Sequence, residues 1–191
     1  MTTAVMYNSD GMIMQVRSGN SGGVLADAQA SGHSYLLVES DIDLDRFYVN
    51  TDTSEVVEYP EKPSDAHVFN FTSRAWELDL GEARAMAWSR IKRSRNADEF
   101  STFEWNSHTF QCDERSQSRI MSAVQRAQLD STLTMVWTLS DNSTVSLNAT
   151  ELKQVGQALS SHIDACHVRA RGLRTQINAA ETEAELDLIT W

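Results

Sequence analysis

The sequence has few cysteines, no long apolar run and few basic residues in its first part. Its 191 residues include only two cysteines, and neither belongs to a CxxC pair. Two cysteines are too few for a disulfide framework in a chain of this size. No apolar run approaches the roughly 20 residues that a membrane-spanning helix requires. The N-terminus lacks a basic start followed by an apolar stretch, so we expect a soluble protein, without membrane insertion, that is made in a cytoplasm.

Charge is distributed unevenly along the chain. The net charge is −11, and residues 1–83 hold fourteen acidic side chains against four basic ones, whereas residues 84–191 hold thirteen against twelve. The first part therefore carries about −10 and the second about −1. This asymmetry indicates two modules. It also argues against nucleic acid as a partner of the N-terminal module, because binding phosphate requires clustered Lys and Arg.

The composition is typical of a folded protein, with 41% hydrophobic and 23% charged residues. We expect an α+β protein of two modules. The first is a small, acidic, antiparallel β-rich module over residues 1–66, followed by a connector over residues 67–81. The second is an α+β module over residues 82–191 with the order α-ββ-α-ββ-α and a long last helix.

In the N-terminal module, turn residues and alternating apolar residues predict the elements. Asp10-Gly11 is the pair that favours a two-residue type I′ hairpin, which places Val5 opposite Val16 and Tyr7 opposite Met14. Residues 19–23 are expected to be a flexible joint before a short helix. The expected elements are strands 3–7 and 12–17, a helix at 24–30, a strand at 35–39, a hairpin of 46–49 with 55–59, and an extended segment at 68–71.

In the C-terminal module, hairpins alternate with amphipathic helices. Phe103 is expected opposite Phe110, and a three-residue loop would pair Trp137 with Leu147 and Leu139 with Val145. The expected elements are helices at 81–96, 113–130 (N-capped by Asp113) and 151–178 (capped by Thr150), with hairpins 102–105/108–112 and 132–139/144–148. The structural core is expected to contain Phe103, Phe110, Trp137, Leu147, Leu159, Ile163 and Leu173.

The last helix carries a heptad stripe over four repeats. Leu152, Leu159, Cys166 and Leu173 recur every seven residues, and Gly156, Ile163, Ala170 and Ile177 follow each of them by four. One interpretation is a coiled coil, which would make the protein a homo-oligomer. However, the flanking positions contain no acidic residues to pair with bases across a seam, and an apolar stripe most often faces a core. We therefore favour packing within the module.

Two residue groups imitate parts of metal sites. His162 and Cys166 are four residues apart on the last helix, but two ligands do not make a zinc site. Asp41, Asp43 and Asp45 resemble the start of a calcium loop. However, the sixth position lacks the glycine that such a loop needs, and only half of the pattern is present. We expect no metal and no other cofactor.

Local signatures of catalysis and nucleic-acid recognition are absent. The sequence has no GxSxG, phosphate-loop, HExxH or dinucleotide-binding motif, and we expect no enzyme and no small-molecule substrate. The densest basic run, from Arg90 to Arg95, has no stacking aromatics or reader motif beside it. A basic helix end explains this run more simply than nucleic-acid binding does.

The C-terminal module resembles an uncharacterised domain family that is common in bacteriophage tail proteins. The matching segments over about residues 82–191 are FEWNSHTFQCDERSQSRI, VWTLSDNSTVSLNATEL and GLRTQINAAETEAELDLITW. The segment FYVNTDTSEVVEYPEKPSDAHVFNFTSRAWELD has a weaker similarity to phage tail-fibre and fibre-assembly proteins. The resemblance implies a tail-associated role and supplies no catalytic residues.

The sequence and the resemblance together predict a function based on protein contacts. We expect a non-enzymatic structural protein of a bacteriophage tail, in a fibre, baseplate or adaptor position, located in the virion and bound to other tail proteins. The alternative is a tail-fibre assembly chaperone that is not retained in the virion. The expected partner-binding residues form an acidic edge that would face a basic partner: Asp41, Asp43, Asp45, Asp52 and Glu55.

Overall fold

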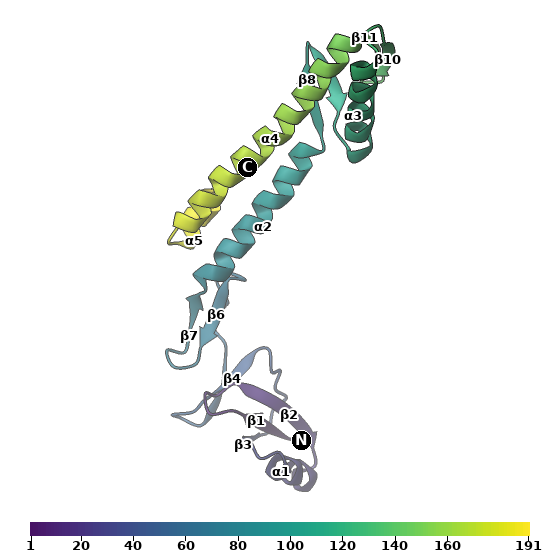
Figure 1. Cartoon of the computed structure of the whole chain (residues 1–191). Helices are drawn as coiled ribbons and strands as arrows, with labels where there is room; N and C mark the ends of the chain where they lie inside the picture. Colours follow the sequence, from purple (N-terminus) through teal and green to yellow (C-terminus); the bar gives the residue numbers. More distant parts are fainter. The chain divides into compact units, whose positions relative to one another are not determined.

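The computed structural model describes residues 1–191, which form two compact units, Met1–Asp79 and Leu80–Trp191. Each unit is described by itself (Figure 1). Helices combine with small antiparallel sheets, which confirms the α+β class. In chain order the elements are β1 (Thr2–Tyr7), β2 (Ile13–Gly19), α1 (Ser21–Ala30), β3 (Ser34–Val38), β4 (Phe47–Asn50), β5 (Glu55–Glu58), β6 (His67–Asn70), β7 (Ala75–Leu78), α2 (Leu80–Glu99), β8 (Thr102–Trp105), β9 (His108–Gln111), α3 (Glu114–Leu129), β10 (Thr134–Thr138), β11 (Thr144–Asn148), α4 (Ala149–Ala179) and α5 (Glu183–Leu188).

The N-terminal unit begins with an antiparallel sheet of strand order β2-β1-β3. Successive residues of the central strand β1 face opposite sides, as the period of a strand requires. Ala4 and Met6 pack with Val24 of α1 on one side. Val5 packs with Val49 of β4 on the other side. The central strand is therefore buried on both faces.

The register of the first hairpin agrees with the prediction at one end and departs from it at the other. Val5 pairs with Val16, as the sequence predicts. Tyr7 pairs with Ile13 and not with the predicted Met14, because the register shifts between Met6 and Tyr7. A bulge of this kind inserts one unpaired residue and bends the strand.

The loop of this hairpin is not the predicted two-residue type I′ turn. That turn requires positive φ at both central residues, and here only Gly11 has one, with φ +98. Instead, the Asn8 side chain accepts hydrogen bonds from the amides of Asp10 and Met12, both at 3.0 Å. The Val49 amide donates to the Gly11 carbonyl at 2.8 Å. A Cβ at Gly11 would lie 2.0 Å from the Val49 oxygen, so only glycine permits this approach.

Helix α1 begins earlier than predicted. The sequence predicts a flexible joint over residues 19–23, but the helix starts at Ser21 and includes two of those glycines. The Asn20 side chain accepts a hydrogen bond from the Gly23 amide at 2.8 Å. This N-cap satisfies one of the free amides of the first turn and offsets part of the low helix propensity of glycine.

The expected connector over residues 67–81 is wrong, because residues 67–78 form the third hairpin of the unit, β6–β7. Two features close it. The Asn70 side chain accepts from the amides of Thr72 and Ser73 at 2.8 and 3.2 Å, and Arg74 has a positive φ of 54 before the second strand. Positive φ is uncommon for a residue with a side chain. Because residues 70–74 contain no Gly or Pro, the sequence does not predict a turn there.

An aromatic cluster joins hairpins β4–β5 and β6–β7 within the N-terminal unit. Phe69 lies at its centre, with ring centroids 4.9 Å from Tyr48 and 4.6 Å from Tyr59. The Trp76 indole donates a hydrogen bond to the Pro60 carbonyl at 2.7 Å. Tilted and edge-on aromatic pairs contribute about 0.5–1.5 kcal/mol each beyond area burial. The members of the cluster are Tyr48, Tyr59, Phe69, Phe71 and Trp76.

The C-terminal unit has the predicted order α-ββ-α-ββ-α, followed by the short helix α5. The second hairpin differs from prediction in register. Trp137 pairs with Val145 and Met135 with Leu147, two residues away from the predicted pairs. The loop has three residues, as predicted, but it lies at 140–142, one position earlier, because the Leu139 amide donates to the Ser143 carbonyl at 2.9 Å. A shift of two keeps every side chain on its predicted face.

The long helix α4 begins two residues earlier than predicted, because Asn148 and not Thr150 is its N-cap. The Asn148 side chain accepts from the Thr150 and Glu151 amides at 2.9 and 3.1 Å. The Glu151 carboxylate accepts from the Asn148 amide at 2.8 Å. This reciprocal capping box satisfies donors at both positions.

Helix α4 packs against α2 and α3 of its own unit, and Figure 1 shows α2 and α4 side by side. Its heptad stripe is covered by these elements, with Leu159, Cys166 and Ile177 at 2%, 4% and 0% exposure. Ile163 and Leu173 are half-buried. The stripe therefore packs within the unit. This is the interpretation that we favour because the flanking positions contain no acidic residues.

Candidate functional site

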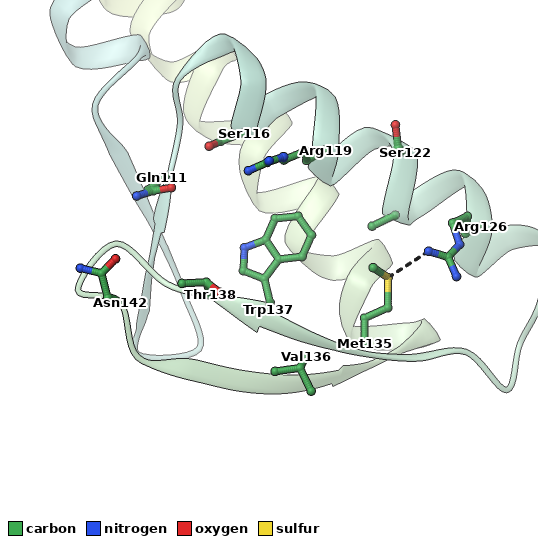
Figure 2. A pocket seen from close by; sticks show the side chains of 11 residues that line it. Gln111, Ser116, Arg119, Ser122, Arg126, Met135, Val136, Trp137, Thr138 and Asn142 are labelled. Carbon is green, nitrogen blue, oxygen red and sulfur yellow. Dashed lines mark hydrogen bonds between the residues drawn. The ribbon is translucent and has the colours of Figure 1, made fainter.

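An open groove lies between α3 and β10 of the C-terminal unit (Figure 2). Its volume is about 600 Å³. We call it the arginine groove because two arginines of α3 lie along one wall. It is lined by Gln111, Ser116, Arg119, Ser122, Ala123, Arg126, Met135, Val136, Trp137, Thr138 and Asn142.

Helix α3 positions the two arginines. Asp113 is its N-cap, as predicted, and accepts from the Arg115 and Ser116 amides, each at 3.0 Å. The buried face of the helix contains Ile120, Ala123 and Ala127. Arg119 and Arg126 border this buried face and are seven residues apart, or two helical turns. Both side chains are therefore presented at the same edge of the helix.

Strand β10 supplies the floor of the groove. Trp137 and Met135 alternate with exposed residues and point toward α3, whereas Val136 points away and is 71% exposed (Figure 2). The Trp137 ring is half-buried, and its centroid lies 6.5 Å from that of the fully buried Phe110. One side of the indole thus contacts the core while the other side remains open to the groove.

The guanidinium groups of the groove have few partners. Arg126 donates only to the Met135 sulfur, at 4.0 Å, which is a weak hydrogen bond. Hydrogen bonds from Thr132, with a smaller contribution from Arg126, hold the pKa of the Asp130 carboxyl below its usual range. Arg119 makes no hydrogen bond or ion pair. The groove is consequently a positively charged wall over an apolar aromatic floor.

The five acidic residues expected as one partner-binding edge are all exposed but have different surroundings. Asp52 forms an ion pair with Arg74. The Asp43 carboxylate accepts from the Asp45 amide at 3.0 Å and stabilises a turn. Asp41 and Glu55 line a second groove, between β3 and β5. The five residues therefore do not form one continuous edge. Asp41 and Glu55 lie at the second groove without a hydrogen bond or ion pair.

The residues expected in the core occupy two environments. The fully buried members share one cluster around Phe110, which stacks on Phe103 with ring centroids 5.4 Å apart. Trp137 and Ile163 are partly buried against the same cluster, and Leu173 is half-buried further along α4. The buried members are Phe103, Phe110, Leu147 and Leu159.

His162, Cys166 and His167 contact the end of α2, His162 and Cys166 at Asp98 and His167 at Glu99. His162 Nε2 lies 3.2 Å from the Asp98 carbonyl, and Cys166 Sγ donates to the Asp98 carboxylate at 3.8 Å. His167 pairs with Glu99 at 3.3 Å. Burial, followed by the nearby Asp98 carboxylate, raises the pKa of the Cys166 thiol. No group of three or more His, Cys, Asp or Glu side chains is placed to share a metal ion.

The basic residues of α2 anchor the C-terminal segment that follows α4. Arg84 donates to the Ala180 carbonyl at 2.7 and 3.2 Å. Arg90 donates to the carbonyls of Leu186 and Ile189 at 2.8 and 3.3 Å. These bonds satisfy backbone carbonyls at the C-terminal ends of α4 and α5. The sequence interpretation of a solvated basic helix end misses this role, because the partners are about a hundred residues away.

Comparison with protein families gives the chain its one identification. Residues 82–190 match a family described as a domain of unknown function, DUF4376. The chain belongs to this family. The DUF4376 region contains the whole arginine groove, whereas the N-terminal unit lies outside the matched range. Comparison with curated proteins and with solved structures found no match. No helix of the chain is both long enough and apolar enough to cross a membrane.

Proposed function

We propose that the protein is a non-enzymatic structural component of a bacteriophage tail that acts by binding other tail proteins. The observation that carries this proposal is the arginine groove. Arg, Trp and Met are the residues enriched at protein interfaces, and energetic hot spots are richest in Trp, Tyr and Arg. The location in a tail is proposed from the sequence resemblance of residues 82–191 alone.

The groove defines the chemistry of its partner. Arg119 and Arg126 are separated by about 10 Å along the helix axis, from seven residues at 1.5 Å each. Arg119 has no internal partner and Arg126 has only its weak bond to the Met135 sulfur, so each guanidinium can bind a carboxylate through two parallel hydrogen bonds. Trp137 and Met135 form an apolar floor on the strand side of the two arginines (Figure 2), which favours an apolar side chain in the partner. We expect an acidic surface of a tail protein, with an apolar residue between two carboxylates.

The N-terminal unit offers the opposite charge. Residues 1–79 contain thirteen acidic side chains and four basic ones. A chain with an arginine groove in one unit and an acidic surface in the other is suited to an adaptor position, in which each unit binds a different neighbour. Complementary charges of this kind mainly set association rates and the choice of partner.

Reversing the charge of the groove should remove the protein from the tail. In phage that carry Arg119→Glu with Arg126→Glu, we expect at least about a tenfold loss of the protein from purified particles, because two desolvated charge pairs are replaced by repulsion. Both arginines are exposed, so the fold should be retained. Quantitative mass spectrometry of the particles measures the loss, and circular dichroism checks the fold.

The matched control changes the same charge elsewhere in the same unit. Lys92 and Lys153 are exposed and make no hydrogen bond or ion pair. The variant Lys92→Glu with Lys153→Glu should be incorporated at the wild-type level. Wild-type incorporation of the arginine variant would show that the groove does not hold the protein in the tail.

A further inference from the structure

The second groove of the molecule lies entirely within the N-terminal unit, between β3 and β5. We call it the strand-edge groove, and its volume is about 730 Å³. It is lined by residues 36–38 of β3, residues 40–42 that follow this strand, Phe47 of β4 and residues 54–58 at β5. Side chains of a strand alternate between its faces, so a surface that touches every residue of a run follows the edge of the strand.

Both strands have a free edge. β3 is the last strand of the β2-β1-β3 sheet and pairs only with β1. β5 pairs only with β4. A free edge of an antiparallel strand presents unpaired N–H and C=O groups at every second residue, and such a row is a template for pairing with another strand. The groove is therefore bordered by two strands that each have one edge without a strand partner.

The side chains of the groove select the occupant. Its floor contains half-buried apolar residues that also pack on the core of the sheet, among them Leu36, Phe47 and Val56. Its rim carries the carboxylates of Asp41 and Glu55, which have no hydrogen bond or ion pair. A second copy of the chain would bring the same carboxylates to the groove, and like charges at close range disfavour that pairing.

From this arrangement we infer that the strand-edge groove accepts an extended segment of a partner tail protein, with apolar side chains alternating with lysine or arginine. The segment adds a strand between β3 and β5 through main-chain hydrogen bonds. Its apolar side chains contact Leu36 and Val56, and its basic side chains pair with Asp41 and Glu55. Strand addition to a free edge obtains affinity from the backbone and specificity from alternate side chains.

The test uses the full chain and two synthetic decapeptides, one that alternates lysine with valine and one that alternates glutamate with valine. The lysine peptide should slow hydrogen exchange of backbone amides at residues 36–38 and 55–58. In Asp41→Lys with Glu55→Lys its affinity should fall about tenfold, since two exposed charge pairs become repulsive. The control Asp27→Lys with Glu61→Lys changes exposed carboxylates outside the groove and outside the expected acidic edge, and it should bind as the wild type does.

Three results would overturn the inference. They are no protection by the lysine peptide at any concentration, equal protection by the glutamate peptide, or protection without peptide that increases with protein concentration, which would make a second copy the occupant. The inference rests on the proposed protein-binding function, but its failure is separable from the failure of that function. Arg119→Glu with Arg126→Glu lies in the other unit, so it should bind the lysine peptide normally while being lost from particles.

Discussion

Phe110→Ala is expected to unfold the C-terminal unit or to leave it only marginally stable. Phe110 is fully buried, stacks on Phe103 and contacts the ring of Trp137. Truncating a buried Phe costs about 3–5 kcal/mol, against a total stability of about 5–15 kcal/mol for a domain. Urea denaturation of the full chain, followed by near-ultraviolet circular dichroism, measures the loss.

Phe100→Ala is the matched control, because Phe100 follows α2 and is 37% exposed. It removes the same atoms from a site that already contacts solvent, so its cost should be well below that of Phe110→Ala. If the two variants had the same denaturation midpoint, the core assigned to the C-terminal unit would be wrong.

Gly156→Ala is expected to destabilise the protein although alanine is the better helix former. A Cβ at Gly156 would lie 2.5 Å from Cγ2 of Val124, where α3 and α4 approach each other. Val124 cannot move away cheaply, since valine in a helix has one strongly preferred rotamer. Overpacking costs about 1–3 kcal/mol, which offsets or exceeds a propensity gain of about 1 kcal/mol. Thermal denaturation of the full chain measures the difference.

Gly172→Ala on the same helix is the control, because a Cβ there meets nothing within 4 Å. It should stabilise by up to about 1 kcal/mol, the propensity difference alone. Adding Val124→Ala to Gly156→Ala should restore part of the stability by removing the clash. An increase in melting temperature for Gly156→Ala equal to that for Gly172→Ala would contradict the close approach of α3 and α4.

Elements with local signals could be predicted from the sequence. Phe103 and Phe110 flank the polar pair Asn106-Ser107, and the structure pairs them as expected, with positive φ at both turn residues. Asp113 directly precedes an amphipathic helix and caps it. In these cases one short segment contains both the turn or cap and the apolar pattern that confirms it.

Two hairpins show where local signals are insufficient. Apolar matching decides which face of a strand is buried, but registers two residues apart place every side chain on the same face. The pairing of Trp137 with Val145 is therefore set by the loop, where Asp141 accepts from the Ser143 amide at 2.9 Å. Hairpin β6–β7 lacks Gly at its turn, but Asn70 has the same position and role as Asn50 in β4–β5, so comparison of the two segments could have revealed it.

The candidate site depended on distant contacts. Arg119 and Arg126 border the apolar stripe of α3 seven residues apart, which is a signal present in the sequence. No local signal places Trp137 in the same groove as these arginines, because that position follows from the packing of β10 against α3. The sequence shows the acidic edge as a group of nearby charges. It does not show that Asp52 pairs with Arg74 while Asp41 and Glu55 line the strand-edge groove, because these contacts depend on how the hairpins pack.

Mass spectrometry of purified wild-type phage particles tests the central proposal most directly. A structural component of the tail should be present in a fixed ratio to other tail proteins. A tail-fibre assembly chaperone would also bind tail proteins, but it would be abundant in infected cells and missing from finished particles. Stoichiometric presence is the result that the proposal predicts, and absence from particles despite expression in infected cells would contradict it.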